Sequence, residues 1–317
     1  MIEKKQAQVA NFNIVIGEDE KPMLDFFDTY IYPALTSGIT RKEEGAEYLL
    51  KGIELMVDKR EEYVIAGKLV KRTELEIKSD IDNKGQLIEK DEKHSSAPYS
   101  TFVVYLKNHR VVIVPNQKGS PTLASFRATI YYILYEFRRK YNENVEENKK
   151  LPVPDVKIVG IPSVKSIDEV LSDVKKVNEL TLCFYPLNGD IDFSSMFETM
   201  TTDLRRTVGA NRGRTILKSP QNKQGIAKVL KDANGTIDPV LKVTTKENSI
   251  ITLRDYELME KYNIDVVTSG DFKDENISII KETENLSVIE YTNNQHDEIY
   301  ERNKSKIIRF IPRNKKG

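Results

Sequence analysis

The chain has 317 residues, of which 39% are hydrophobic and 31% are charged, a balance typical of a folded globular protein. Lysine plus arginine and aspartate plus glutamate both number 49, so the formal net charge is zero. This argues against a protein that binds nucleic acid over its whole surface, although it allows a local basic patch. No apolar run approaches the roughly 18 residues of a membrane span, and one cysteine, Cys183, excludes an intramolecular disulfide. We therefore expect a cytoplasmic protein, and its length favours two domains.

The first part of the chain alternates between strand and helix patterns. Helical spacing of apolar residues and period-two alternation of polar and apolar residues separate the two kinds of element. The predicted elements are a strand over 8–16, a helix from Pro22 to Gly38, a helix over 43–58, a strand over 63–77 bent at Gly67, and a charged, mobile connection over 86–96.

The stretch over 100–141 is predicted to form the nucleus of the first domain. β-branched and aromatic residues fill 101–106 and 111–114, on either side of a short turn, which indicates an antiparallel hairpin. Apolar residues over 123–141 recur at helical spacing, so we expect an amphipathic helix whose apolar face covers the hairpin.

The composition changes to charged residues and prolines over 142–154, which is typical of a linker. This divides the chain into domains over 1–141 and 155–317. Beyond the linker we predict strands over 156–161, 180–185 and 214–218, helices over 166–177, 193–208 and 221–233, a hairpin over 236–253, weaker strands over 259–268, 277–282 and 286–291, and a helical tail that ends in an edge strand over 307–311. The expected fold class is α+β, with a mixed, mostly antiparallel sheet covered by helices in each domain and a ferredoxin-like second domain.

Several short motifs are distinctive. They are Ser166-Ile167-Asp168-Glu169-Val170-Leu171, Tyr185-Pro186-Leu187-Asn188-Gly189-Asp190 after Leu180-Thr181-Leu182, Asn234-Gly235-Thr236-Ile237 with Thr252-Leu253-Arg254-Asp255-Tyr256, and, earlier, Asn11-Phe12-Asn13-Ile14 and Lys107-Asn108-His109-Arg110-Val111. In these motifs the chain resembles the bacterial family called domain of unknown function 4747, which is met in mobile-element and phage-defence settings. The resemblance covers most of the chain in layout. It implies an antiviral or accessory role and supplies no active site.

One stripe of the helix over 123–141 is a candidate contact surface for nucleic acid. Arg127, Tyr131, Tyr135 and Arg138 follow one another at i, i+4, i+8 and i+11 beside the apolar face. Guanidinium groups can pair with phosphates, and tyrosine rings can stack on bases. The alternative is that the tyrosines border the core while the arginines extend into solvent.

A second basic cluster surrounds Gly209 and Gly213, whose backbone freedom could bring N–H groups together on an anion. The cluster consists of Arg205, Arg206, Arg212, Arg214 and Lys218. The alternative is a helix that ends at Gly209, followed by a surface turn whose arginines offset the helix dipole.

Two weaker patterns would suit a nuclease. Glu76 and Lys78 form a Glu-x-Lys pair on a predicted strand, where the carboxylate could bind a metal and the lysine could steady the attacking water. A metal-free ribonuclease would need a histidine as general base, and His109 at the hairpin turn is the candidate. We expect the histidines to lie apart, so the sequence predicts no metal site and no cofactor.

These patterns favour a non-catalytic component of a bacterial anti-phage or mobile-element system, which recognises DNA, RNA or a partner protein. A nuclease of such a system and a purely protein-binding adaptor are the alternatives. We expect no membrane span, and a homo-oligomer is compatible with the sequence.

Overall fold

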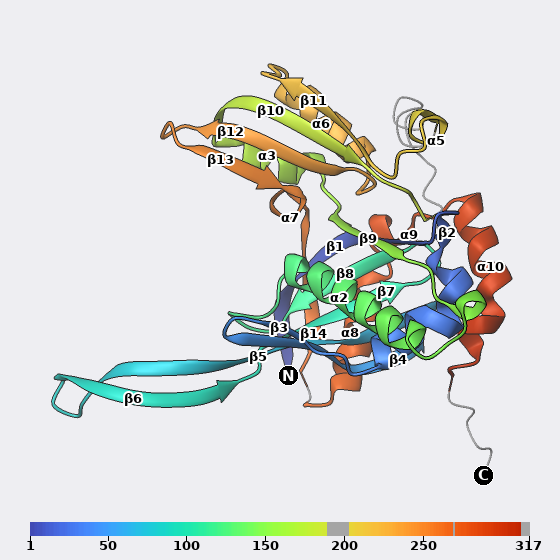
Figure 1. The fold of residues 1–317 in the computed structure, drawn as a ribbon. Helices are drawn as coiled ribbons and strands as arrows, with labels where there is room; N and C mark the ends of the chain where they lie inside the picture. The colour runs from blue at the N-terminus through green and yellow to red at the C-terminus, as the bar shows by residue number, and fades with distance from the viewer. Residues whose placement is uncertain (189–202, 269, 312–317) are drawn as a thin grey trace, which may run out of the picture.

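The computed structural model describes residues 1–188, 203–268 and 270–311, which form two antiparallel sheets with helices packed on them, as Figure 1 shows. Within these residues the larger sheet has ten strands, and its main path runs β14-β1-β8-β7-β5-β4-β3. The strands of this path are β1 (Ile2–Ile16), β3 (Arg41–Glu43), β4 (Ala46–Val57), β5 (Tyr63–Ile81), β7 (Tyr99–Tyr105), β8 (Arg110–Pro115) and β14 (Lys261–Val267). Off this path, β2 (Lys21–Pro22) and β9 (Pro154–Gly160) pair with β1, and β6 (Leu87–Ser96) pairs with β5.

Strand β1 pairs with four other strands of the larger sheet. One of its edges pairs with β8. Its other edge pairs first with β14, over residues 2–8, and then with β9, over residues 10–16. The second half of β1 is buried on both faces, which explains why its sequence reads as a nearly continuous apolar run.

Helix α2 (Leu123–Asn142) covers one face of this sheet. It begins at Thr122, whose hydroxyl accepts a hydrogen bond from the Ser125 backbone N–H at 3.3 Å. Phe126, Ile130 and Leu134 are fully buried against the sheet, and burial of each such side chain contributes about 1.5–3 kcal/mol. The predicted hairpin, now β7 and β8, and its covering helix are confirmed.

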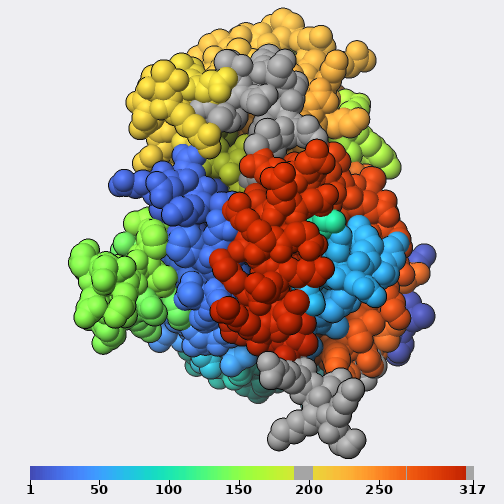
Figure 2. All heavy atoms as spheres, turned by 90° about the vertical axis from the view of Figure 1, so that its right-hand side faces the viewer, coloured from blue at the N-terminus to red at the C-terminus, as the bar shows by residue number. Residues whose placement is uncertain are grey.

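The C-terminal helices pack against the larger sheet and the helical segment that follows β2. Helices α8 (Phe272–Thr283) and α9 (Ser287–Glu290) bury Ile279, Ile280 and Ile289 in a second apolar cluster, together with side chains of the sheet. Helix α10 (Asn294–Ile308) packs against the N-terminal segment, as Figure 2 shows in red and blue. That segment consists of the 3-10 helix η1 (Met23–Phe26), the π-helix η2 (Phe27–Ile31) and α1 (Tyr32–Thr36). Arg302 donates to the Asp25 carboxylate at 2.9 Å across this contact.

The smaller sheet has the order β11-β10-β12-β13. Its strands are β10 (Val174–Phe184), β11 (Gly213–Lys218), β12 (Asp238–Thr245) and β13 (Ile250–Arg254), accompanied by α3 (Val164–Ser172), the short α5 (Arg205–Thr207), α6 (Lys223–Asp232) and α7 (Asp255–Leu258). Its own apolar core joins α3 and α6 to one face of the sheet. The α+β fold class, with antiparallel sheets covered by helices, is therefore confirmed.

Several local predictions are wrong. Residues 46–57 form β4 rather than a helix, since they pair with β3 and β5 on their two edges. Residues 87–96 form β6 rather than a mobile connection. Both 277–282 and 286–291 fall in helices α8 and α9 instead of strands, and 307–311 contains the end of α10 and a turn. Most of the predicted helix over 193–208 lies outside the described residues.

The predicted linker does not divide the structure. Strands β9 and β14 both lie beyond 142–154, yet both pair with β1 in the larger sheet. The polar segment itself forms an ordered turn, because the Leu151 carbonyl accepts hydrogen bonds from Arg138 at 2.9 Å and Asn142 at 3.0 Å. The smaller sheet is instead an insertion between β9 and β14. The chain leaves β1 at Ile161, whose N–H donates to Val9 at 3.0 Å, and it returns at Glu260, whose N–H donates to Ile161 at 3.2 Å.

Candidate nucleic-acid interface

The structure brings the two predicted basic clusters to the same side of the molecule. Tyr131 and Arg138 from α2 and Arg212 from the second cluster line one groove of about 680 Å³. A neighbouring hollow of about 520 Å³, lined by Arg205 and Arg206, shares Glu18, Glu20 and Asn211 with that groove. The two clusters therefore border one continuous surface, although 66 or more residues separate them in sequence.

Most arginines of the second cluster have carboxylate partners. Arg205 is only 5% exposed. Its guanidinium donates two hydrogen bonds to the Glu20 carboxylate, one to each oxygen, and the Nη2 bond is 2.7 Å long. Arg206 lies 3.6 Å from the same carboxylate. Arg212 is exposed and donates to Asp155 at 2.8 Å. Arg205 thus joins α5 to the turn between β1 and β2, whereas Arg206 and Arg212 are exposed to solvent.

The arginines of the α2 stripe are structural anchors, and this differs from both sequence interpretations. Arg127 donates to the fully buried Asp255 carboxylate at 2.5 Å, and that carboxylate also accepts from the Gly160 backbone N–H at 2.8 Å. The Arg138 Nε–H donates to the Leu151 carbonyl at 2.9 Å. Arg127 and Arg138 are partly buried, whereas the two tyrosines are exposed. Tyr131 is 50% exposed, Tyr135 is 43% exposed, and their rings stack with centroids 6.3 Å apart.

The smaller sheet leaves one face open. Leu180, Leu182 and Leu241 point into the core beneath α3 and α6. Successive side chains of a strand alternate between faces. Residues one position away, such as Thr181 and Lys242, must therefore lie on the opposite face.

Exposed cations gather on this open face. Arg214 pairs in register with Cys183, Arg254 with Val240, and Thr252 with Lys242, so all three cations share the face. Among the described residues, no carboxylate lies within ion-pair distance of Arg214, Lys242 or Arg254. Lys218, at the far end of β11 on the same face, pairs with Glu179, a carboxylate that is also in register with Lys242. We call Arg214, Lys242 and Arg254 the cationic face.

Sequence reasoning missed Lys242 and Arg254. Each stands alone in its strand, so neither contributes to a cluster along the chain. The signal that could have found them is the alternation in the predicted hairpin over 236–253, which places Lys242 on the face opposite Leu241 and, continued by one residue, places Arg254 on that face too.

The cationic face continues towards α2. Arg254 directly precedes Asp255, which holds Arg127, and Tyr131 lies one helical turn beyond Arg127. Asp238 lies at the same end of the sheet, and burial, reinforced by the nearby Asp255 charge, raises the pKa of its carboxyl group. A chain-like ligand could therefore contact cations on the sheet and aromatic rings on α2 in sequence.

The candidate nuclease pair lies far from this surface. Glu76 and Lys78 stand on the exposed part of β5 and contact each other at 3.2 Å. Hydrogen bonds from Lys93 and from Lys78 hold the pKa of Glu76 below its usual value. Across the described residues, no group of three or more His, Cys, Asp or Glu side chains is arranged to hold a metal ion.

His109 lies at the predicted turn, but it is fully buried rather than solvent-facing. The turn is covered because the Asn108 side chain donates to the Tyr291 carbonyl at 3.2 Å, beside the end of α9. His109 also meets His296, against expectation, with ring centroids 5.5 Å apart and the rings nearly perpendicular. Both imidazoles belong to the interior of the larger sheet's domain.

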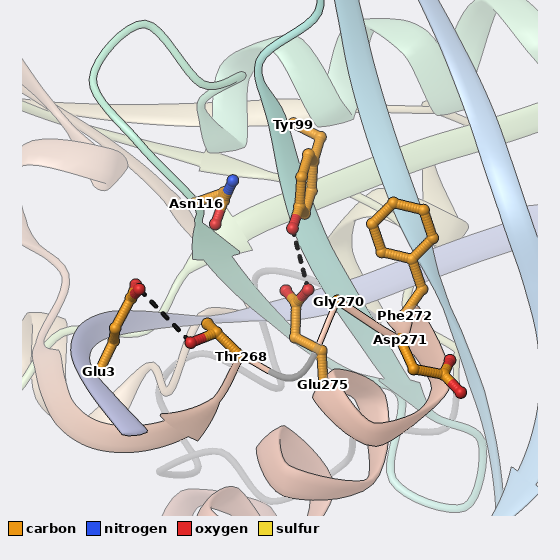
Figure 3. Close-up of a pocket in the computed structure, with 8 residues that line it drawn as sticks. All are labelled: Glu3, Tyr99, Asn116, Thr268, Gly270, Asp271, Phe272 and Glu275. Atoms are coloured by element: carbon orange, nitrogen blue, oxygen red, sulfur yellow. Dashed lines mark hydrogen bonds between the residues drawn. The ribbon is translucent and has the colours of Figure 1, made fainter. Parts of the chain in front are cut away.

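Lys68 forms a buried charge network that the sequence did not indicate. Its ammonium, 2% exposed, lies 3.3 Å from the Glu275 carboxylate and donates to Thr101 at 2.8 Å and Asn276 at 2.9 Å. Burial lowers the pKa of Lys68 to about 8, while Glu275 acts in the opposite direction. In Figure 3 the Tyr99 hydroxyl points at Glu275, to which it donates at 2.9 Å.

This network borders a small pocket of about 220 Å³. Glu3 and Thr268 lie across the pocket from Tyr99 in Figure 3. Within the network each charge is compensated by the chain itself, and the bonds join α8 to β5 and β7. We therefore assign Lys68 and Glu275 a structural role.

A search against models of known protein families and a search of curated protein sequences both find no match for this chain. No helix in the described part of the chain is long and apolar enough to cross a membrane.

Proposed function

We propose that the protein binds single-stranded nucleic acid without cleaving it, along the cationic face and the adjoining tyrosines of α2. The observation that supports this proposal is the presence of three exposed cations on one open sheet face, with no carboxylate partner among the described residues. The setting implied by the motif resemblance, a bacterial defence or mobile-element system, is part of the same proposal.

The free energy needed to break a cation's existing ion pair decides whether that cation can bind phosphate. Arg214, Lys242 and Arg254 are exposed and form no ion pair with a described carboxylate, so a phosphate would have no such pair to break there. The exposed Arg212–Asp155 pair is worth about 0–1 kcal/mol, so exchange of Asp155 for a phosphate costs little. Removing Arg127 from the buried Asp255 would cost about 3–5 kcal/mol, which excludes it as a contact.

The tyrosines favour a single strand over a duplex. Unpaired bases can stack on exposed rings, and each stacked base contributes about 1–3 kcal/mol. Tyr131 and Tyr135 are half exposed on an outer helix face, whereas the bases of a duplex are already stacked on each other. A neutral chain with one cationic face also fits local contact better than general coating.

The test is a fluorescence-anisotropy titration of labelled single strands and duplexes of DNA and RNA at several salt concentrations. Alanine substitution of Arg214, Lys242 and Arg254 together should weaken binding at least tenfold. It should also lower the slope of log affinity against log salt by about 2, since each phosphate contact to a single strand contributes about 0.7.

The matched control removes three lysines from the covering helices of the same sheet, on its opposite face. Lys165, Lys228 and Lys231 are all exposed, so their alanine variant has the same net charge as the test variant. Binding by this control should equal that of the wild type. Equal weakening in both variants would show a general charge effect and refute the site, as would unchanged binding in the test variant.

A further inference from the structure

The β5–β6 hairpin forms an arm that projects from the larger sheet, visible at the lower left of Figure 1. Strand β5 pairs with β7 as far as Val70 and with β4 as far as Thr73. Beyond Thr73, β6 is its only partner among the described strands. The outer edge of β6 therefore offers a row of backbone N–H and C=O groups to another chain.

The side chains of the arm are divided between internal pairing and exposure. Lys90 contacts Asp80 at 3.0 Å, and Lys93 contacts Glu76 at 3.1 Å. Apolar side chains, in contrast, are left in solvent: Leu75 is 57%, Ile81 68% and Leu87 77% exposed. Exposed apolar residues beside an open strand edge are typical of a surface that receives a partner.

The charge order along β6 indicates a second copy of the chain as that partner. Residues 89–93 read Glu-Lys-Asp-Glu-Lys. In an antiparallel pair centred on Asp91, Glu89 faces Lys93 of the partner subunit and Lys90 faces Glu92 of the partner subunit. Two-fold symmetry doubles each attraction, and only Asp91 faces its own copy. A shift by one residue places like charges opposite each other in either direction, Lys90 against Lys93 of the partner subunit or Glu89 against Glu92 of the partner subunit.

We propose that two copies associate through their β6 edges, antiparallel about a two-fold axis at Asp91, to form a four-stranded ribbon from the two arms. The arm is acidic overall, but its long-range repulsion is screened beyond about 8 Å at physiological salt, whereas opposite residues lie about 5 Å apart. A register shift in the β5–β6 ladder, between Ile77 and Ser79, increases the local twist and disfavours open-ended stacking. A single pair of strand edges makes a small contact, so we expect a weak dimer that depends on protein concentration. This inference does not depend on nucleic-acid binding.

Sedimentation velocity across a concentration series tests the proposal by charge exchange. Lys90→Glu and Glu92→Lys each replace two attractions with two repulsions, so either variant alone should dimerise at least tenfold more weakly than the wild type. An equimolar mixture of the two variants restores opposite charges and should regain the dimer. Lys84→Glu, at the arm's turn and outside the paired register, is the matched control and should dimerise like the wild type.

Cysteine crosslinking locates the axis independently. Cys183→Ser removes the only native thiol, and Asp91→Cys in that background should form a disulfide-linked dimer under mild oxidation. Lys84→Cys in the same background should stay monomeric on a non-reducing gel. A monomeric wild type at high micromolar concentration, a dimer insensitive to Lys90→Glu, or a variant mixture that remains monomeric would each overturn the proposal.

Discussion

The two sheets differ in the burial and the ion pairing of the cations discussed above. In the larger sheet, Lys68 is buried and fully engaged by Glu275, Thr101 and Asn276. In the smaller sheet, Lys242 and Arg254 stand exposed on an open face and form no ion pair in the described part of the chain. Burial and ion pairing therefore decide whether a cation stabilises the fold or is available to a ligand. The number of cations nearby in the sequence does not decide it.

Removal of one buried charge should have the largest effect. Lys68→Met leaves Glu275 buried without its cation, and breaking a buried ion pair in this way costs about 3–5 kcal/mol. Urea denaturation should show this loss, and adding Glu275→Gln should recover part of it. Lys242→Met, on the open face, should leave the unfolding midpoint almost unchanged. If both lysine variants behave alike, the contrast between the sheets fails.

The pH dependence of stability should separate the same lysines. The pKa of Lys68 falls from 10.5 to about 8 on folding, so between these values the unfolded chain binds more protons. Stability then rises with pH in this range, and the contribution is lost as pH falls through about 8. Comparing wild type with Lys68→Met by denaturation from pH 7 to pH 10 should show this rise in the wild type alone. Parallel curves would contradict the lowered pKa.

The tyrosines should contribute to binding without contributing to its salt dependence. Alanine at Tyr131 and Tyr135 should cost about 1–3 kcal/mol per stacked base for single strands. Because the rings carry no charge, the salt slope should match that of the wild type. Phenylalanine at both positions keeps the rings and should restore affinity. A changed slope, or an equal loss for duplexes, would show that the rings do not stack on bases.

Substitution of Glu76 and Lys78, on the β5–β6 arm, should have the smallest effect on stability and binding. Glu76→Gln and Lys78→Ala alter solvent-exposed side chains and should leave the unfolding midpoint and nucleic-acid binding unchanged. Incubation of wild type and variants with labelled DNA and RNA, with Mg²⁺ and with chelator, should show no cleavage. Cleavage that disappears in Glu76→Gln would instead support the nuclease alternative.

Local patterns predicted much of the fold where one period was clear. The hairpin, helix α2 and strands β5, β9 and β11 follow directly from the sequence. Residues 46–57 were predicted as a helix because Tyr48, Ile53 and Met56 recur at helical spacing. They form a strand because they pair with β3 and β5, and spacing within 46–57 does not reveal this pairing. The return of β14 to β1 spans over 250 residues and has no local signal.

The candidate site was predicted only in part for the same reason. Arg214 and the tyrosines follow from clustering and helical spacing. Arg205 and Arg127 fit the same patterns, but Glu20 and Asp255, distant in sequence, occupy them. Lys242 and Arg254 become neighbours only through strand pairing, so spacing along the chain could not reveal them.

The insertion of the smaller sheet between β9 and β14 has an evolutionary consequence. Strands β14 and β9 pair one after the other with the same edge of β1. The chain leaves the larger sheet at Ile161 and returns at Glu260, whose N–H donates to the Ile161 carbonyl at 3.2 Å. A module inserted at two such adjacent crossings can diverge while every strand of its host keeps its neighbours, provided that side-chain contacts such as Arg127–Asp255 are kept. Substitutions on the exposed cationic face therefore leave the strand pairing of the larger sheet unchanged.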